Sequence, residues 1–353
     1  MNKEQLVNSF SYEVEYTQAG PHTKDKRPYL RYGSLPEDQQ IFSYMIEAKT
    51  TPLVEKKYKV SGVENIEDKR VLMVIPNHNR TENLLAVVKS FSYMRRTGIV
   101  VVDGAPKANK KIRDCVLKNK GCYIWIKHEE GVPFNKSDAM NIGHSLTCNL
   151  DADWYVFHDT DVILSSNFEE SLIKRIKDPV LPLVFQCFGG QRVPYLGVEQ
   201  SNMLRTIAEN HGKISVDSAM SAYQSPDAFW TAPGAPGGSI AVHTSLFDKV
   251  GGYDADWYAG YGPEDATFLT KCIRTITQEK LKPKMTLHQI DMKSLEDVLG
   301  LHIHHEPPVI CEKDFIVVDI IQPCFMRLRD RSFNNILNMS QEKLNQYKKA
   351  YSL

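Results

Sequence analysis

Short, largely apolar runs recur along the central part of the chain, and polar turns separate them. The clearest runs lie at residues 70–76, 97–104, 122–126, 154–164, 180–188 and 237–243. Runs of this length and composition are typical of strands that are buried on both faces of a sheet. Segments with helical periodicity lie between and after them, at residues 81–91, 108–119, 134–149, 168–176, 199–210, 245–250 and 266–276. Strands that alternate with helices predict right-handed βαβ units and an α/β fold with a mixed, mostly parallel sheet flanked by helices.

The two ends of the chain have a different character. Residues 1–65 are polar and rich in tyrosine, with one predicted helix at 36–48, and we treat them as an N-terminal extension. Residues 66–330 carry the alternating pattern and are predicted to form the main domain, followed by a C-terminal helix at 331–353. Within the main domain, residues 189–236 are rich in glycine and proline, which indicates a substrate-facing insertion on the acceptor side.

Composition narrows the class of protein. A length of 353 residues suits two domains, or one large α/β domain with appendages, at about 150 residues per domain. The 43 basic and 43 acidic residues leave no net charge, which disfavours nucleic acid or a charged membrane surface as partner. Seven cysteines without a C-x-x-C pair indicate neither a disulfide framework nor a cysteine zinc site. The first residues lack the apolar core of a signal peptide and no run approaches ~18 apolar residues, so we expect a cytoplasmic protein without a transmembrane segment.

The run at 154–164 is the most informative one, because Asp159 and Asp161 interrupt it. Ionised carboxylates at the end of a buried strand are costly unless a cation or a hydrogen-bond donor meets them. At positions i and i+2 they would project to the same side of an extended chain, where hard oxygen ligands suit a divalent cation. The alternative is a turn in which the two aspartates only cap the next element, and a bare D-x-D does not decide between the two.

A second pair with the same spacing is His302 and His304. Two imidazoles on one face of an extended segment would complete a mixed oxygen and nitrogen shell, which favours Mn²⁺ or another transition ion over Mg²⁺. The alternative is a pair of ordinary histidines that bond to the backbone. His305 follows directly, so the register of the segment stays open.

Glu264 and Asp265 stand at the start of a predicted helix, where the helix dipole stabilises ionised carboxylates. They are either simple charge complements of the helix or a site where one carboxylate takes a proton from a hydroxyl group.

Polar and basic residues follow the strand at 70–76, and Lys136 stands at the start of a later helix. An anionic nucleotide would meet helix N-termini at such positions, although an ordinary strand-to-helix turn has the same composition. The chain contains neither G-x-G-x-x-G nor G-x-x-x-x-G-K-[ST], so the usual dinucleotide and P-loop interpretations lack support.

Four motifs stand in order between residues 70 and 305. They are Val74-Ile75-Pro76-Asn77-His78-Asn79-Arg80, Phe134-Asn135-Lys136-Ser137-Asp138-Ala139-Met140-Asn141-Ile142-Gly143, Asp159-Thr160-Asp161, and Gly237-Gly238-Ser239 with Tyr261-Gly262-Pro263-Glu264-Asp265. They resemble the P-x-R-x-R turn, the FNRA-x-x-x-N-x-G helix, the D-x-D and the GG-x-S…GWGGED stretch of GT-A fold glycosyltransferases. The resemblance is closest to the inverting β-1,4-galactosyltransferase group and to bacterial capsule or chondroitin polymerases. Asn77-His78, Lys136 and Tyr261 depart from the usual residues.

This resemblance implies a Rossmann-like GT-A domain and a metal-dependent, inverting transfer of a sugar from a nucleotide sugar, expected to be UDP-linked, to a glycan or glycoconjugate hydroxyl. Asp161, His302 and His304 would hold Mn²⁺ or another divalent cation. Asp265 would be the catalytic base. The resemblance assigns the acceptor and donor sugar to Glu264, Tyr261, Gly238 and Asp159, and the nucleotide to Pro76, Asn77, Arg80, Asp103 and Lys136.

Two other functions remain open at this point. One is a catalytically inactive protein of the same fold that binds a nucleotide or a glycan. The other is a sugar nucleotidyltransferase, which is expected to carry a glycine-rich N-terminal nucleotide loop that this sequence lacks. A shared fold does not choose among them.

Overall fold

The structure is a computed structural model that describes residues 12–16, 28–32, 58–130, 134–177, 183–188, 194–225, 229–230, 238–255, 264–279, 295 and 297–305. The helices expected at 36–48 and 331–353 lie outside these residues. The division of the chain at residues 65 and 330 stays a prediction.

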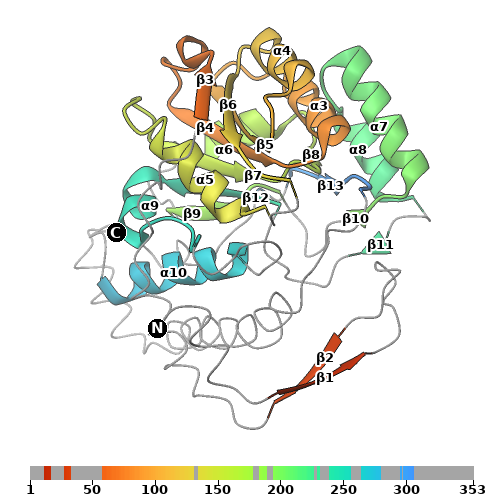
Figure 1. Cartoon of the computed structure of the whole chain (residues 1–353). Coiled ribbons are helices and arrows are strands. Elements are labelled where there is room, and N and C mark those ends of the chain that lie inside the picture. The colour runs from red at the N-terminus through yellow and green to blue at the C-terminus, as the bar shows by residue number, and fades with distance from the viewer. Residues whose placement is uncertain are drawn as a thin grey trace, which may run out of the picture.

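A seven-stranded sheet forms the centre of the molecule, in the order β3-β6-β5-β4-β7-β12-β9 (Figure 1). Its strands are β3 (Tyr58–Ser61), β4 (Val71–Asn77), β5 (Thr97–Ala105), β6 (Cys122–Lys127), β7 (Trp154–His158), β9 (Val184–Gln186) and β12 (Ser239–His243). The four central strands β6, β5, β4 and β7 are parallel, whereas β3, β12 and β9 join antiparallel. The α/β fold with a mixed, mostly parallel sheet flanked by helices is therefore confirmed.

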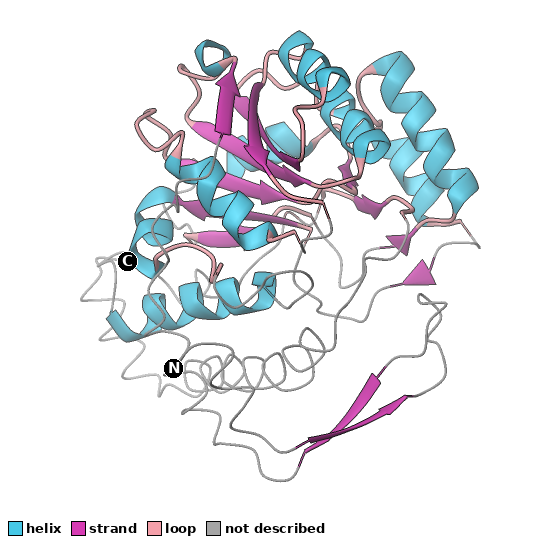
Figure 2. Ribbon diagram, viewed as in Figure 1, coloured by secondary structure: helices cyan, strands magenta, loops and turns pink. Residues whose placement is uncertain are grey.

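Helices cover both faces of this sheet (Figure 2). One core is built with α3 (Thr81–Ser90), α4 (Lys110–Lys118), α6 (Phe168–Ile176), α7 (Val198–His211) and α8 (Val216–Tyr223), and the other with α5 (Lys136–Ser145), α9 (Thr244–Val250) and α10 (Glu264–Glu279). Alternate residues of β4 supply the two cores: Met73 and Ile75 enter the first, and Leu72 and Val74 enter the second. This alternation is the period of two of a strand that is buried on both faces.

A smaller sheet has the order β11-β10-β13-β8, with β8 (Val162–Leu164), β10 (Pro194–Tyr195), β11 (Phe229–Trp230) and β13 (Gly300–His302). The apolar run at 154–164 is divided at the two aspartates: β7, the strand predicted to end at the carboxylates, belongs to the large sheet, and β8 belongs to the small one. The polar residues 159–161 form the turn between them. The predicted insertion supplies β10, α7, α8 and β11; α7 matches the predicted helix, whereas α8 was not anticipated.

Two small elements complete the described part of the chain. Strands β1 (Tyr12–Tyr16) and β2 (Pro28–Tyr32) pair antiparallel, and η1 (Val63–Asn65) is a single 3₁₀ turn. No helix among the described residues is long and apolar enough to span a bilayer.

The order of the parallel strands indicates where in the sheet a ligand-binding site is expected. From β4 the chain moves outward through β5 to β6, and it then returns to place β7 on the other side of β4. Neighbouring connections diverge at such a reversal, and the crevice at the carboxyl ends of the strands there is where ligands bind in open α/β sheets. Asn77 ends β4, and Asp159 follows β7 directly.

Candidate active site

The turn between the two sheets separates the two carboxylates of the D-x-D. The backbone N–H of Asp159 donates to the carbonyl of Gly238 at 2.8 Å, and the N–H of Val162 donates to the carbonyl of Asp159 at 3.3 Å. Because the segment turns instead of extending, Asp159 and Asp161 contact different partners. Gly238 has a φ of +79°, a left-handed value that favours glycine. It therefore supports the turn through its backbone.

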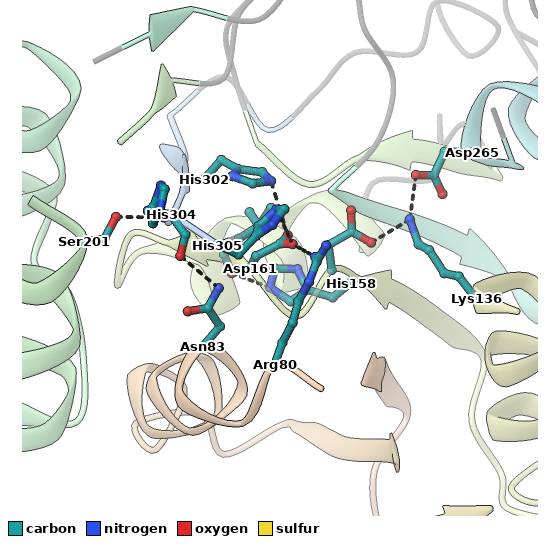
Figure 3. A network of polar contacts seen from close by, with 12 residues as sticks. Arg80, Asn83, Lys136, His158, Asp161, Ser201, Asp265, His302, His304 and His305 are labelled. Atoms are coloured by element: carbon teal, nitrogen blue, oxygen red, sulfur yellow. Dashed lines mark hydrogen bonds and ion pairs between the residues drawn. The ribbon is translucent and has the colours of Figure 1, made fainter. Parts of the chain in front are cut away.

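Asp161 lies among three nitrogen-bearing side chains (Figure 3). The guanidinium of Arg80 forms an ion pair with its Oδ2. Nε2 of His302 lies 3.5 Å from Oδ1, and Nε2 of His305 lies 3.2 Å from Oδ2. One possible ligand atom from each of Asp161, His302 and His305 lies within 4.8 Å of the others. Segments about 140 residues apart in the chain therefore meet in one partly buried cluster.

The charges of this cluster suit a cation. Burial by itself would raise the pKa of Asp161, but His302, Arg80 and His305 lower that pKa to about 2. Burial lowers the pKa of His302 to about 4 against the attraction of Asp161, so an ionised carboxylate faces a neutral imidazole. Oδ1 of Asp161 is buried and has no hydrogen-bond partner among the described residues. One carboxylate and two imidazoles fit Mn²⁺ or another transition ion.

His304, the predicted second histidine ligand, is not part of this cluster. Its backbone N–H donates to Oγ of Ser201 at 2.7 Å, and its carbonyl accepts from Nη2 of Arg205 at 2.7 Å. Both partners belong to α7, so the insertion fixes the backbone of the histidine segment. The sequence leaves open which histidine faces Asp161, and it contains no signal for this support from α7.

A second charged cluster surrounds Lys136, at the start of α5. Its Nζ lies 2.7 Å from Oδ1 of Asp159, 3.0 Å from Oε1 of Glu264 and 2.9 Å from Oδ2 of Asp265. An ammonium group has three hydrogens, so it can give one to each carboxylate. Its carboxylate partners raise the pKa of Lys136 well above its usual value although burial opposes this. The lysine is therefore a permanent cation here.

Asp265 has an unusual proton affinity in this cluster. Burial raises its pKa most, Glu264 and Asp159 raise it further, and Lys136 lowers it, with a result of about 7. A carboxyl group with a pKa near the working pH can both accept and release a proton, which suits general base catalysis.

The helix α5 explains why the Phe134–Gly143 motif has its particular residues. The side chain of Asn141 donates to the carbonyl of Tyr253 at 2.8 Å and accepts from its N–H at 2.9 Å. Nδ2 of Asn135 donates to the carbonyl of Ala255 at 2.6 Å. A Cβ on Gly143 would lie 2.5 Å from a side chain of β4, so glycine permits close packing. The motif thus fixes Lys136 against the sheet and holds the segment that precedes α10.

The predicted nucleotide residues divide into buried and accessible ones. Pro76 and Asn77 are buried at the end of β4. The amide of Asn77 donates to Oδ1 of Asp103 at 2.7 Å, and the hydroxyl of Tyr123 donates to Oδ2 at 2.7 Å. Asp103 is 1% exposed, so in this arrangement it holds Asn77 in place. Arg80 and Lys136 are partly exposed, although Arg80 is engaged with Asp161 and Lys136 with three carboxylates.

Three rings lie near the ends of β4 and β6, and sequence reasoning had not identified them as a group. His78 stacks on Phe134 with centroids 5.1 Å apart, and His128 meets both rings edge-on. All three are half-buried. Their only signal in the sequence is the position of His78 and His128 directly after strands. Tyr261, the remaining predicted residue, lies outside the described residues.

No protein-family model matches the chain, and no curated protein matches its sequence. Among solved structures it is similar to the mannosyltransferase PcManGT from Pyrobaculum calidifontis in complex with GDP-Man and Mn²⁺, at 14% identity and a TM-score of 0.33. That likeness covers 67% of this chain but only 60% of the mannosyltransferase.

The chain is also similar to glucosyl-3-phosphoglycerate synthase from Mycobacterium tuberculosis. In complex with Mn²⁺, UDP and phosphoglyceric acid, that enzyme shares 13% identity with a TM-score of 0.38, over 79% of this chain and 82% of that chain. Its complex with Mg²⁺ and UDP gives 14% identity and a TM-score of 0.36, over 70% and 76%. Likenesses this distant do not assign an activity. Neither protein is a β-1,4-galactosyltransferase or a capsule polymerase by name, so that narrower resemblance stays a prediction.

Proposed function

We propose that this protein is a metal-dependent, inverting glycosyltransferase that moves a sugar from a UDP-linked donor to a hydroxyl group of a glycan or glycoconjugate. One observation supports this most. Asp159 and Asp161 share one turn at the reversal of strand order, and each belongs to a different charged cluster. One cluster suits a cation, and the other contains a carboxyl group with a pKa near neutrality. Metal-assisted transfer to a hydroxyl needs both functions within reach of one substrate.

The metal would be held by Asp161, His302 and His305, and we substitute His305 for the predicted His304 on the basis of its position. A bound Mn²⁺ or similar ion supplies positive charge for the diphosphate leaving group. Arg80 adds a guanidinium beside the same carboxylate, and guanidinium groups suit phosphate oxygens.

Asp265 is the proposed base. As the acceptor oxygen attacks the anomeric carbon, its proton passes to the carboxylate of Asp265. The bond from the anomeric carbon to the diphosphate oxygen breaks on the opposite side, and its electron pair leaves with UDP. A single displacement of this kind inverts the anomeric configuration. Asp159 is assigned to the donor sugar or ribose, and Glu264 to the acceptor.

The rings of His78, Phe134 and His128 are proposed to receive the nucleobase. They lie near the carboxyl ends of β4 and β6, and an aromatic surface offers stacking to a flat base. Asp103 and Asn77 are buried and hydrogen-bonded to each other, and we propose that they support this region without contacting the nucleotide directly.

A donor screen tests the function. Purified protein with Mn²⁺ and a panel of sugar nucleotides is assayed for release of the nucleoside diphosphate, with and without mixed glycan acceptors. Release of UDP from at least one donor, lost on chelation and restored by Mn²⁺, is expected. Absence of release from every donor, with UDP binding intact, would favour the inactive binding protein. Formation of a sugar nucleotide from a sugar phosphate and UTP would favour the nucleotidyltransferase.

A further inference from the structure

The cluster around Lys136 joins three elements that sequence reasoning had treated separately. Lys136 opens α5, Asp159 lies in the D-x-D turn, and Glu264 and Asp265 open α10. The side chains of these four residues are between 13% and 25% exposed. In Figure 3 Lys136 reaches Asp265 on the side of Asp161 that faces away from the histidines. The ammonium therefore lies between the donor side and the base side of the proposed site.

The charges in this cluster do not balance. One ammonium meets three carboxylates, all within 3.0 Å of its Nζ. Asp265 is thus faced by one cation from α5 and by two acids, Asp159 and Glu264. Burial and, after it, the charge of Asp265 raise the pKa of the Tyr253 phenol. Like charges at such separations oppose ionisation, and an adjacent cation favours it. Lys136 is the only cation that contacts Asp265 among the described residues.

We propose that Lys136 is a positioning residue that keeps the base Asp265 ionised and oriented, and that it is not primarily a ligand of the nucleotide. This inference rests on the proposed function, because it assigns Asp265 as the base. It differs from the role implied by the sequence resemblance, which places Lys136 in the nucleotide pocket. Its Nζ already has three carboxylate oxygens within 3.0 Å, and an ammonium has only three hydrogens to donate.

The two roles predict different results for Lys136→Met. A base must be ionised, so kcat/KM falls as the pH drops through the pKa of Asp265. Removing the ammonium raises that pKa, and the acid limb of the pH profile moves to higher pH. We expect a shift of at least about one pH unit, which corresponds to a tenfold lower activity on the acid side of the limb. The affinity for UDP with Mn²⁺, measured by calorimetry, is expected to change less than about threefold.

Two further variants test the direction in which the acid limb of the pH profile moves. Lys136→Arg keeps the charge and should return the acid limb most of the way to its wild-type position. Glu264→Gln removes a like charge and should move the limb to lower pH, opposite to Lys136→Met. Lys118→Met, on the exposed face of α4, is the matched control and should leave both profile and affinity unchanged. Thermal unfolding of each variant verifies that it is folded.

An unmoved acid limb in folded Lys136→Met, together with weakened UDP binding, would overturn the inference and restore the nucleotide role. If the wild-type protein transfers no sugar from any donor, the proposed function fails but the inference is still testable. The pKa of Asp265 is then measured directly by carboxyl-carbon NMR in wild type and Lys136→Met. Equal pKa values in the two proteins would overturn it by that route.

Discussion

Each of the two charged clusters at the D-x-D turn contains a largely buried carboxyl group, and the pKa values of these two groups are shifted in opposite directions. Around Asp161, one carboxylate is met by a guanidinium and two imidazoles, and its pKa falls to about 2. Asp265 is one of three carboxylates that share one ammonium, and the pKa of Asp265 rises to about 7. Burial would raise both pKa values, so the number of cationic and anionic neighbours decides the direction. Because Asp159 and Asp161 belong to one turn, that turn connects a cluster whose charges suit a cation with a cluster that contains a carboxyl group of near-neutral pKa.

The largest effect is expected from Asp265→Asn. The amide cannot accept the acceptor proton, so transfer should fall by about 10²–10⁴. Because the cluster around Asp161 is untouched, Mn²⁺-dependent UDP binding should persist. UDP release and calorimetry measure the two quantities, and Asp114→Asn on the exposed side of α4 is the control. Transfer at a near wild-type rate would remove Asp265 from the role of base.

The metal side is tested by a matched pair, His305→Ala and His304→Ala. Removing His305 takes away a proposed ligand, and Mn²⁺ affinity should fall by at least about tenfold. Removing the His304 side chain leaves its backbone contacts with α7 in place, so affinity should stay within about twofold. Calorimetric titration with Mn²⁺ and UDP gives both values, and Asp161→Ala should abolish the binding. If His304→Ala lowers the Mn²⁺ affinity more than His305→Ala does, His304 is the ligand and His305 is not.

A smaller effect on the same side is expected from Arg205→Met. Its guanidinium holds the carbonyl of His304 at 2.7 Å, and loss of that contact lets the histidine segment move. Groups that orient metal ligands typically contribute about 10–100-fold to affinity, and one of several supports should lie near the lower end. Arg113→Met, a partly exposed arginine of α4, is the control for Mn²⁺ titration. Unchanged affinity would show that the contact with α7 does not position the ligands.

The pH dependence of the wild type gives the mildest test. Asp265 is active as a base only when ionised, so kcat/KM should be level above its pKa of about 7 and fall as the pH drops below it. The slope on the acid side should approach about tenfold per pH unit for a single group. Rates of UDP release between pH 5 and pH 9 measure this. A profile that stays level down to pH 5 would contradict the raised pKa.

Much of the fold follows from local patterns. The strands β4, β5, β6 and β12 and the helices α3 to α7 lie close to their predicted positions, because apolar runs and helical periodicity are properties of neighbouring residues. For the candidate site, the sequence identified the residues that could do chemistry but not all of the contacts between them. The D-x-D, the acidic start of α10 and the histidines were all identified, and the resemblance placed His302 beside Asp161. The contacts of Lys136 with Asp159, Glu264 and Asp265 were not predicted.

Two predictions about local geometry are wrong for the same physical reason. Both the D-x-D and the histidine pair were treated as i and i+2 positions on an extended chain. In the structure β7 ends at His158 and β13 ends at His302, so strand alternation does not apply beyond either residue. His305 therefore approaches Asp161 in place of His304, and Asp159 turns toward Lys136.

The sequence by itself determined the element types, the α/β class and the residues able to do chemistry, since these depend on composition and spacing within short segments. Only the tertiary structure decided which of them meet. β13 pairs with β8 and β10, segments more than 100 residues away, and those pairings place His302 beside Asp161. Lys136 meets its three carboxylates because α5 packs against β4 while α10 starts at the same edge of the sheet. Contacts of such long range depend on the packing of the whole core, which no local pattern encodes.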